Sequence, residues 1–172
     1  FQALLRQTTD KKKRKILLAS KVEDMINTVV RQIAFYTFER KVHTARKEGE
    51  LTPDKINEIW LEIQAESLGD SIGIGPGYET FWASIPHFIH SPFYVYAYAF
   101  GDCLVNSLYA RYQESEAGFQ EKYFTMLKAG GTQHHSELLK PFGLDATDPE
   151  FWQKGLSVIS RLIDELETMG NA

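Results

Sequence analysis

The sequence has 172 residues, 43% of them hydrophobic and 13% aromatic, which is enough for a domain with a packed core and too apolar for a disordered chain. Its formal net charge of −4 gives no overall attraction to nucleic acid or to anionic membranes. A single cysteine, Cys103, excludes an intrachain disulfide, and the sequence contains no apolar stretch long enough to predict a membrane-spanning helix. We therefore expect a globular protein of a reducing compartment, the cytoplasm.

Helical periodicity dominates the N-terminal third of the chain. Apolar residues recur at steps of three and four and predict one buried stripe along a long helix, Lys11 to Lys47: Val22, Ile26, Val29, Ile33 and Tyr36. The basic cluster Lys11–Lys15 is followed at once by apolar residues at helical spacing, which favours a solvated helix start over a nucleic-acid patch. Thr52-Pro53 then predicts the N-cap and first residue of a second helix, which should end near Ser67.

A glycine-rich segment, Leu68 to Thr80, follows the second predicted helix. It lacks the Gly-Lys-Ser/Thr ending of a phosphate-binding P-loop, and its glycines do not fit G-x-G-x-x-G. Glycine permits the turns of a loop or a short hairpin. We expect such a connection here, acting either as a plain connector or as a mobile lid.

Helices are predicted again in the C-terminal half. Phe81 to His90 should be irregular or briefly extended, and Ser91-Pro92 should cap a helix that runs to about Gln113. Three more helices are predicted over Ser115–Lys128, over Ser136–Lys140 and after Asp148-Pro149. The sequence thus predicts an all-α fold of about six helices, with residues 1–172 forming a single helical domain.

The histidines are candidate metal ligands. His87 and His90 have the H-x-x-H spacing, but a zinc site needs a third ligand and usually a fourth, normally from another element. His134, His135 and Glu137 could supply them, although nothing in the sequence places the two segments together. H-E-x-x-H does not occur in the sequence. We therefore name no metal ligand in this chain.

The tyrosines suggest a different chemistry. On a helix Tyr94 and Tyr98 would share a face, about 40° apart, whereas Tyr96 would point about 160° away from each. One interpretation is an amphipathic aromatic core, in which buried phenols find hydrogen-bond partners. The other is a wall of Tyr hydroxyl and His N–H donors that stabilises an oxyanion. The spacing by itself is compatible with both.

The run from Trp82 to Ala99 resembles the "IPHF…PFYVYxYA" signature of oligoendopeptidase F, one of the thimet-oligopeptidase-like zinc metallopeptidases. The segments Gly130–Asp145 and Asp164–Glu167 resemble the family's "GGS…ELLK…GVD" region and its usual C-terminal end. Val22 to Glu39 is similar to the long helix that follows the family's metal site. The resemblance extends over nearly the whole chain, and the stretch from Pro86 to Tyr98 is its specific part.

This resemblance implies an all-α, two-lobed peptidase with a deep channel for short peptides and a His/Tyr loop across that channel. It assigns His87, Tyr98 and Tyr94 as catalytic candidates and His90 and Tyr96 as substrate-binding candidates. The loop differs in length from that of the thimet branch and lacks its glycine-rich centre. Which of the three tyrosines faces the substrate therefore stays open.

The resemblance also implies that the chain is a C-terminal fragment of a peptidase catalytic domain. An apolar pattern is already running at Phe1, and the zinc motif is absent. We expect zinc to be bound by ligands outside this chain, the chain alone to be inactive, and its partners to be short peptides and the missing N-terminal part. Self-association is possible, and neither nucleic acid nor membrane is expected to bind. The alternative is a non-catalytic helical interaction or oligomerisation domain.

Overall fold

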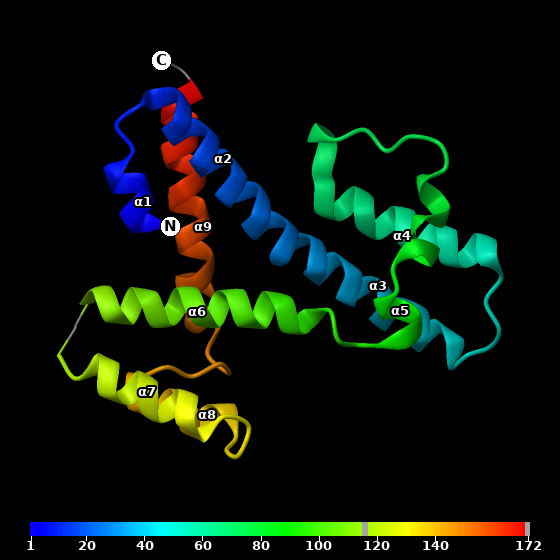
Figure 1. The fold of residues 1–172 in the computed structure, drawn as a ribbon. Helices are drawn as coiled ribbons and strands as arrows, with labels where there is room; N and C mark the ends of the chain where they lie inside the picture. The colour runs from blue at the N-terminus through cyan, green and yellow to red at the C-terminus, as the bar shows by residue number, and fades with distance from the viewer. Residues whose placement is uncertain (115–116, 171–172) are drawn as a thin grey trace. The chain divides into compact units, whose positions relative to one another are not determined.

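The computed structural model describes residues 1–114 and 117–170. Within these ranges it contains nine α-helices, three short 3₁₀ helices and no strand (Figure 1). The all-α prediction is confirmed. The helices outnumber the six expected because short turns such as α1 (Gln2–Gln7) and α5 (His87–His90) are too brief for a periodic signal. No helix in the described part of the chain is long and apolar enough to cross a membrane.

The long predicted helix is present as α2 (Lys11–Thr28) and α3 (Val30–Arg46). Backbone hydrogen bonding continues across Val29, whose N–H donates to the Met25 carbonyl and whose own carbonyl accepts from Ile33. The predicted stripe is partly wrong, because Ile26 and Ile33 are 39% and 46% exposed. The buried residues of α2 and of the junction with α3 follow 4-3-4 spacing instead: Leu18, Val22, Met25 and Val29.

The second predicted helix is α4 (Pro53–Leu68), with the cap that the sequence predicted. The Thr52 hydroxyl oxygen accepts the Lys55 N–H at 3.3 Å. The glycine-rich segment forms a loop between η1 (Gly69–Ser71) and η2 (Tyr78–Ser84), and contains no hairpin. Gly77, with φ of 91°, makes the left-handed turn into η2.

The chain divides into two compact units. Unit 2 is Met25–Phe100, and its core is built mainly from α3 and α4, which pack together. Trp60 is fully buried at its centre, and its ring contacts Phe35, Phe38 and Phe88 at centroid distances of 5.6, 5.1 and 6.3 Å. The indole N–H donates to the Tyr78 carbonyl at 3.0 Å, which ties η2 to α4. An aromatic core thus supports the segment that leads into α5.

Unit 1 comprises Phe1–Asp24 and Gly101–Ala172. It contains α1, most of α2 and most of α6 (Tyr96–Glu114). It also contains the C-terminal elements: α7 (Phe119–Ala129), α8 (His135–Leu139), η3 (Lys140–Phe142) and α9 (Pro149–Gly170). The predicted start of a helix at Ser115 lies outside the described residues. The prediction of a single domain over residues 1–172 stays a prediction.

Two helices of unit 1 cross closely at a glycine. A Cβ placed on Gly155 of α9 would lie 3.0 Å from the Cα of Cys103 in α6. Burial raises the pKa of the Cys103 thiol to about 11, so the thiol stays protonated and unreactive at neutral pH.

Candidate functional site

Three of the predicted site residues form a cluster of rings in unit 2, here called the ring cluster: His87, Tyr94 and Tyr98. The Nε2 atom of His87 lies 3.0 Å from the Tyr98 hydroxyl oxygen. The Tyr94 ring lies parallel to His87 at 6.2 Å and edge-on to Tyr98 at 5.6 Å. The structure therefore brings together the two tyrosines four residues apart and the imidazole of α5.

The route of the chain through this cluster differs from the prediction. Helix α6 begins at Tyr96 and not at Pro92, so Tyr94 lies in the turn of residues 91–95, here called the Phe93 turn. Phe93 has φ of 60°, a left-handed conformation that a bulky L-residue rarely adopts. The helix start predicted from Ser91-Pro92 is therefore wrong, and the backbone of Phe93 makes a tertiary contact.

That contact comes from Glu39 of α3. The Phe93 N–H donates to Oε1 of Glu39 at 2.8 Å, and the Glu39 side chain is only 2% exposed. Burial raises the pKa of Glu39 above its ordinary value of 4.5, while the Phe93 hydrogen bond and the nearby His43 and His87 act to lower it. The sequence held a signal for this residue, since Glu39 stands four residues after Phe35 on the buried face of α3.

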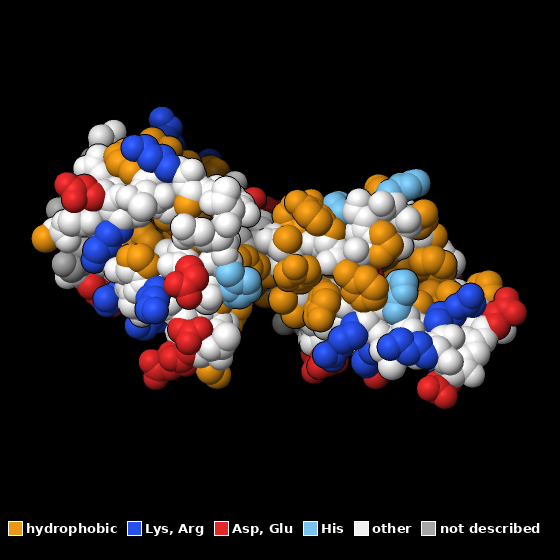
Figure 2. Space-filling view, turned by 90° about the horizontal axis from the view of Figure 1, so that it is seen from below, with side chains coloured by type: hydrophobic (Ala, Val, Ile, Leu, Met, Phe, Trp, Pro, Cys, Tyr) orange, Lys and Arg blue, Asp and Glu red, His pale blue; other side chains and the backbone are white. Residues whose placement is uncertain are grey.

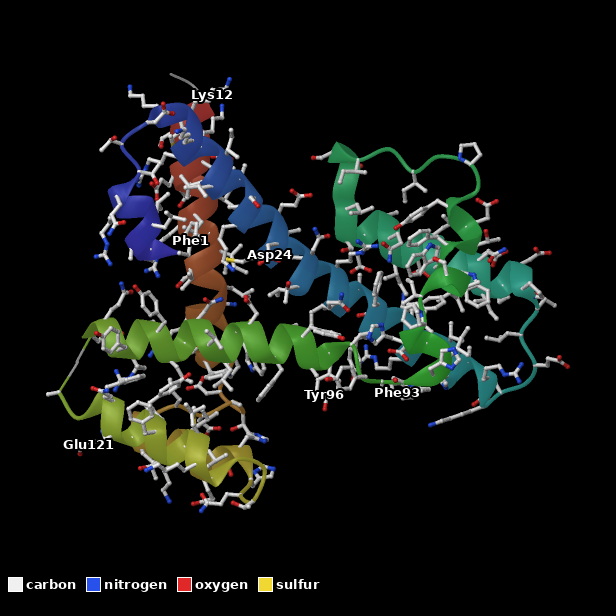
Figure 3. The ribbon with its side chains drawn as sticks, in the orientation of Figure 1. Phe1, Lys12, Asp24, Phe93, Tyr96 and Glu121 are labelled. Carbon is white, nitrogen blue, oxygen red and sulfur yellow. The ribbon has the colours of Figure 1, made fainter. Side chains whose placement is uncertain are left out.

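The other two candidates lie outside the ring cluster. Tyr96 packs edge-on against Tyr36 of α3 at 6.0 Å. His90 ends α5 and is exposed to solvent. Figure 3 shows Phe93 and Tyr96 on the two sides of the entry into α6. The opposite direction of Tyr96, expected from helical geometry, is consistent with its separate partner.

The ring cluster is accessible to a ligand. Tyr94 and Tyr98 are 52% and 39% exposed, so neither residue is sealed in the aromatic core. Figure 2 shows hydrophobic side chains gathered beside pale-blue histidines on one part of the surface. Phenol and imidazole N–H groups on such a surface can donate hydrogen bonds to a carbonyl oxygen that gains negative charge.

The histidines in the described part of the chain do not assemble a zinc site. Over residues 1–114 and 117–170, no group of three or more His, Cys, Asp or Glu side chains could hold a metal ion. The ring centroids of His134 and His135 lie 4.0 Å apart with the rings tilted by 37°, and Nδ1 of His134 lies 2.9 Å from the Ser136 hydroxyl. Two imidazoles without a third ligand do not provide the set that zinc requires.

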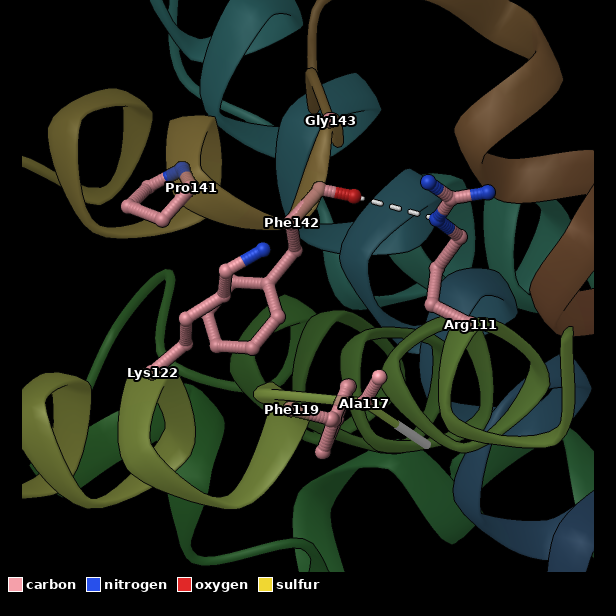
Figure 4. Close-up of a pocket in the computed structure, with 7 residues that line it drawn as sticks. All are labelled: Arg111, Ala117, Phe119, Lys122, Pro141, Phe142 and Gly143. Atoms are coloured by element: carbon pink, nitrogen blue, oxygen red, sulfur yellow. Dashed lines mark hydrogen bonds between the residues drawn. The ribbon is translucent and has the colours of Figure 1, made fainter. Parts of the chain in front are cut away.

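Unit 1 contains a separate cavity of about 150 Å³ (Figure 4). Its lining includes Arg111, Lys122 and Phe142. The Arg111 guanidinium donates to the Phe142 carbonyl at 3.0 Å and pairs with Glu114, so its charge is already compensated. The cavity contains none of the predicted site residues, and the ring cluster remains the candidate site.

Comparison with known proteins identifies the family. The model of peptidase family M3 matches residues 2–158. The chain belongs to peptidase family M3. It is 32% identical over 167 residues to oligopeptidase PepF of Bacillus subtilis (strain 168), covering 96% of this chain and 25% of that protein. It is 30% identical to the plasmid-encoded oligoendopeptidase F of Lactococcus lactis subsp. cremoris, covering 98% of this chain and 28% of the relative.

A solved structure of the M3 family shows the same fold. The crystal structure of oligoendopeptidase-F from Enterococcus faecium superposes with a TM-score of 0.89 at 26% identity, covering 99% of this chain and 33% of that one. The resemblance inferred from the motif at Pro86–Tyr98 is thus confirmed. The chain spans only about a quarter of the length of the two relatives described above.

Proposed function

We propose that this chain is part of a zinc-dependent metalloendopeptidase that hydrolyses short peptides, and that it contributes hydrogen-bond donors to the reaction. The observation that carries the proposal is the ring cluster, in which an imidazole and two phenols meet on an accessible surface. Membership of family M3 and the names of the relatives support a peptide substrate. The zinc ligands lie outside the described residues, and the chain alone is inactive.

The contact between His87 and Tyr98 defines what the pair can donate. If Nε2 carries the proton, it donates to the phenol oxygen, and the Tyr98 hydroxyl hydrogen is free to point at a substrate. If Nε2 is unprotonated, Tyr98 donates to it, and the Nδ1–H of His87 is the free donor. Either tautomer leaves one donor for the scissile carbonyl oxygen, which gains negative charge in the transition state.

The remaining candidates position the peptide. Tyr94 lies parallel to His87 and edge-on to Tyr98, which limits the orientations open to both rings. His90 and Tyr96 are exposed at the borders of the Phe93 turn and can contact substrate on either side of the reacting bond. Correct placement of a bound peptide accelerates its hydrolysis without further chemistry.

The test is a set of variants in the full-length protein. We expect Tyr98→Phe and His87→Ala each to lower kcat/KM for a short peptide by roughly 10²–10³, the usual loss for one oxyanion donor. Tyr109→Phe removes a hydroxyl from the same helix at a position outside the ring cluster, and is the matched control. Values within about twofold of wild type for both Tyr98→Phe and His87→Ala would refute the assignment.

Metal content tests the other half of the proposal. The full-length protein should bind about one zinc ion and lose peptidase activity on chelation, whereas the isolated chain should show neither metal nor activity. A full-length protein without zinc and without peptidase activity would favour the helical interaction domain. A cytoplasmic location stays a prediction.

A further inference from the structure

Glu39 is a buried acid, and packing alone does not explain why an ionisable side chain stands at this position. One carboxylate oxygen accepts the Phe93 N–H at 2.8 Å, and the other, Oε2, is buried without a hydrogen-bond partner among the described residues. A buried carboxylate that is only half satisfied destabilises the folded state, and a glutamine or an apolar residue would avoid the charge. The one specific contact that the carboxylate makes is with the turn that precedes α6.

That turn determines where the tyrosines lie. Phe93 is the only non-glycine residue with positive φ in the described part of the chain, and this conformation is unfavourable unless its surroundings hold it. A bond from N–H to a charged carboxylate is stronger than one to a neutral acceptor. Tyr94 follows Phe93 directly, and its carbonyl accepts the Ala97 N–H as the chain enters α6. The residue that Glu39 contacts, Phe93, thus stands one position before Tyr94 and five positions before Tyr98.

We propose that Glu39 is a positioning residue: its carboxylate holds the left-handed Phe93 turn and thereby places Tyr94 and Tyr98 against His87. The proposal deepens the function proposed above, because its consequence for catalysis rests on that function. Its structural part, the dependence of the ring cluster on Glu39, stands independently of any activity.

The proposal makes the ring cluster sensitive to pH. Within the folded state, where Glu39 is buried in either protonation state, the charged carboxylate accepts the Phe93 N–H more strongly than the neutral acid does. Two titratable groups act on Glu39, His43 from its own helix and His87 from α5, and both favour the carboxylate when they are protonated. The His43 ring also lies 4.7 Å from the Phe93 ring, so it packs on the same turn.

The structural test is NMR of the protein labelled with ¹⁵N-phenylalanine. In wild type the Phe93 amide proton should lie downfield at neutral pH and move upfield as Glu39 is protonated, and NOEs should connect the His87 and Tyr98 rings. Glu39→Gln keeps a carbonyl acceptor and the fold, so the Phe93 amide should lose this titration while the NOEs persist at all pH values. Glu39→Ala should lose both the downfield position and the NOEs.

Two results would overturn the proposal. One is a Phe93 amide titration in Glu39→Gln identical to that of wild type, and the other is a folded Glu39→Ala protein in which the NOEs between His87 and Tyr98 are intact. Glu66→Gln makes the same chemical change at an exposed position of α4 and should leave the spectrum of Phe93 unchanged.

The activity test uses the full-length enzyme and a double variant. In wild type, kcat should fall as the pH is lowered and Glu39 becomes protonated. Glu39→Gln should retain most of kcat at neutral pH and should not show this fall. Glu39→Ala should lower kcat as much as Tyr98→Phe, and the double variant should lose no more than either alone, because both changes remove the same placed hydroxyl. Fully additive losses would contradict the proposal. If Tyr98→Phe and His87→Ala both keep kcat/KM within about twofold of wild type, the proposed function fails, while the NMR result still decides the role of Glu39.

Discussion

The two units each bury one ionisable group, and the surroundings of these groups differ. In unit 1, Cys103 packs against Gly155, and desolvation leaves a neutral thiol in a helix crossing. In unit 2, Glu39 is equally buried, but its carboxylate reaches the backbone of a turn with unfavourable φ. The same desolvation raises the pKa of both groups. Burial alone therefore does not distinguish the two groups, whereas the hydrogen bond between Glu39 and the Phe93 turn does.

The hydrophobic cores of the two units also differ, in the kinds of side chain that they contain. Around Trp60, unit 2 joins α3, α4, η2 and α5 through aromatic rings, and it presents the ring cluster on its surface. Unit 1 combines aliphatic and aromatic side chains around Leu108, Leu139 and Phe142. Four predictions test how far the contrast between the two units holds.

The largest effect is expected for Trp60→Ala in unit 2. Removing a fully buried indole that contacts three other rings should lower the free energy of unfolding by about 3–5 kcal/mol. Urea denaturation followed by circular dichroism measures the change. Phe124→Ala is the control, because this aromatic of unit 1 is half exposed and should cost about 0.5 kcal/mol or less. Equal losses for the two variants would contradict a core centred on Trp60.

The next-largest effects are expected for two glycine substitutions in unit 1, which should change the stability of the protein in opposite directions. Gly155→Ala places a methyl group 3.0 Å from the Cys103 backbone and should destabilise the protein by about 1–3 kcal/mol despite the better helix propensity of alanine. Gly101→Ala, in α6 with open space around it, should stabilise the protein by about 0.5–1 kcal/mol. Thermal unfolding of the two variants would separate them, and a stabilised Gly155→Ala protein would exclude a close crossing.

A smaller loss is expected at the start of α4. Thr52→Ala removes the acceptor for the Lys55 N–H and should cost about 1 kcal/mol, whereas Thr52→Ser keeps the hydroxyl and should cost less. Equilibrium unfolding in urea is again the measurement. If the alanine and serine variants were equally stable, the cap would contribute nothing.

The smallest expected effect is the pH dependence of stability that the buried carboxyl group of Glu39 causes. The pKa of Glu39 is raised in the folded state, so its contribution to stability is complete below its ordinary value of 4.5 and is lost as the pH rises through the folded value. Glu39→Gln should therefore gain stability relative to wild type over that interval. Unfolding curves measured between about pH 3 and pH 8 test this, and a constant difference would show that burial does not disfavour the charge.

Much of the fold could be predicted because the signals are local. Thr52-Pro53 predicted the start of α4, and Asp148-Pro149 predicted that of α9, since caps and proline act on the residues next to them. The motif at Pro86–Tyr98 predicted the family that the comparisons then confirmed. Ile26 and Ile33 misled because periodicity marks apolar positions without showing which face of a helix is covered.

The sequence by itself determined the helical class of this protein, its family, and the set of His and Tyr residues that form the candidate site. Only the tertiary structure decided how they meet: Glu39 of α3 contacts Phe93, 54 positions along the chain, in the turn that precedes the start of α6 at Tyr96. The reason is physical. Propensity and capping act over a few residues, whereas a buried carboxylate can stabilise an unfavourable turn only when packing brings the two segments together.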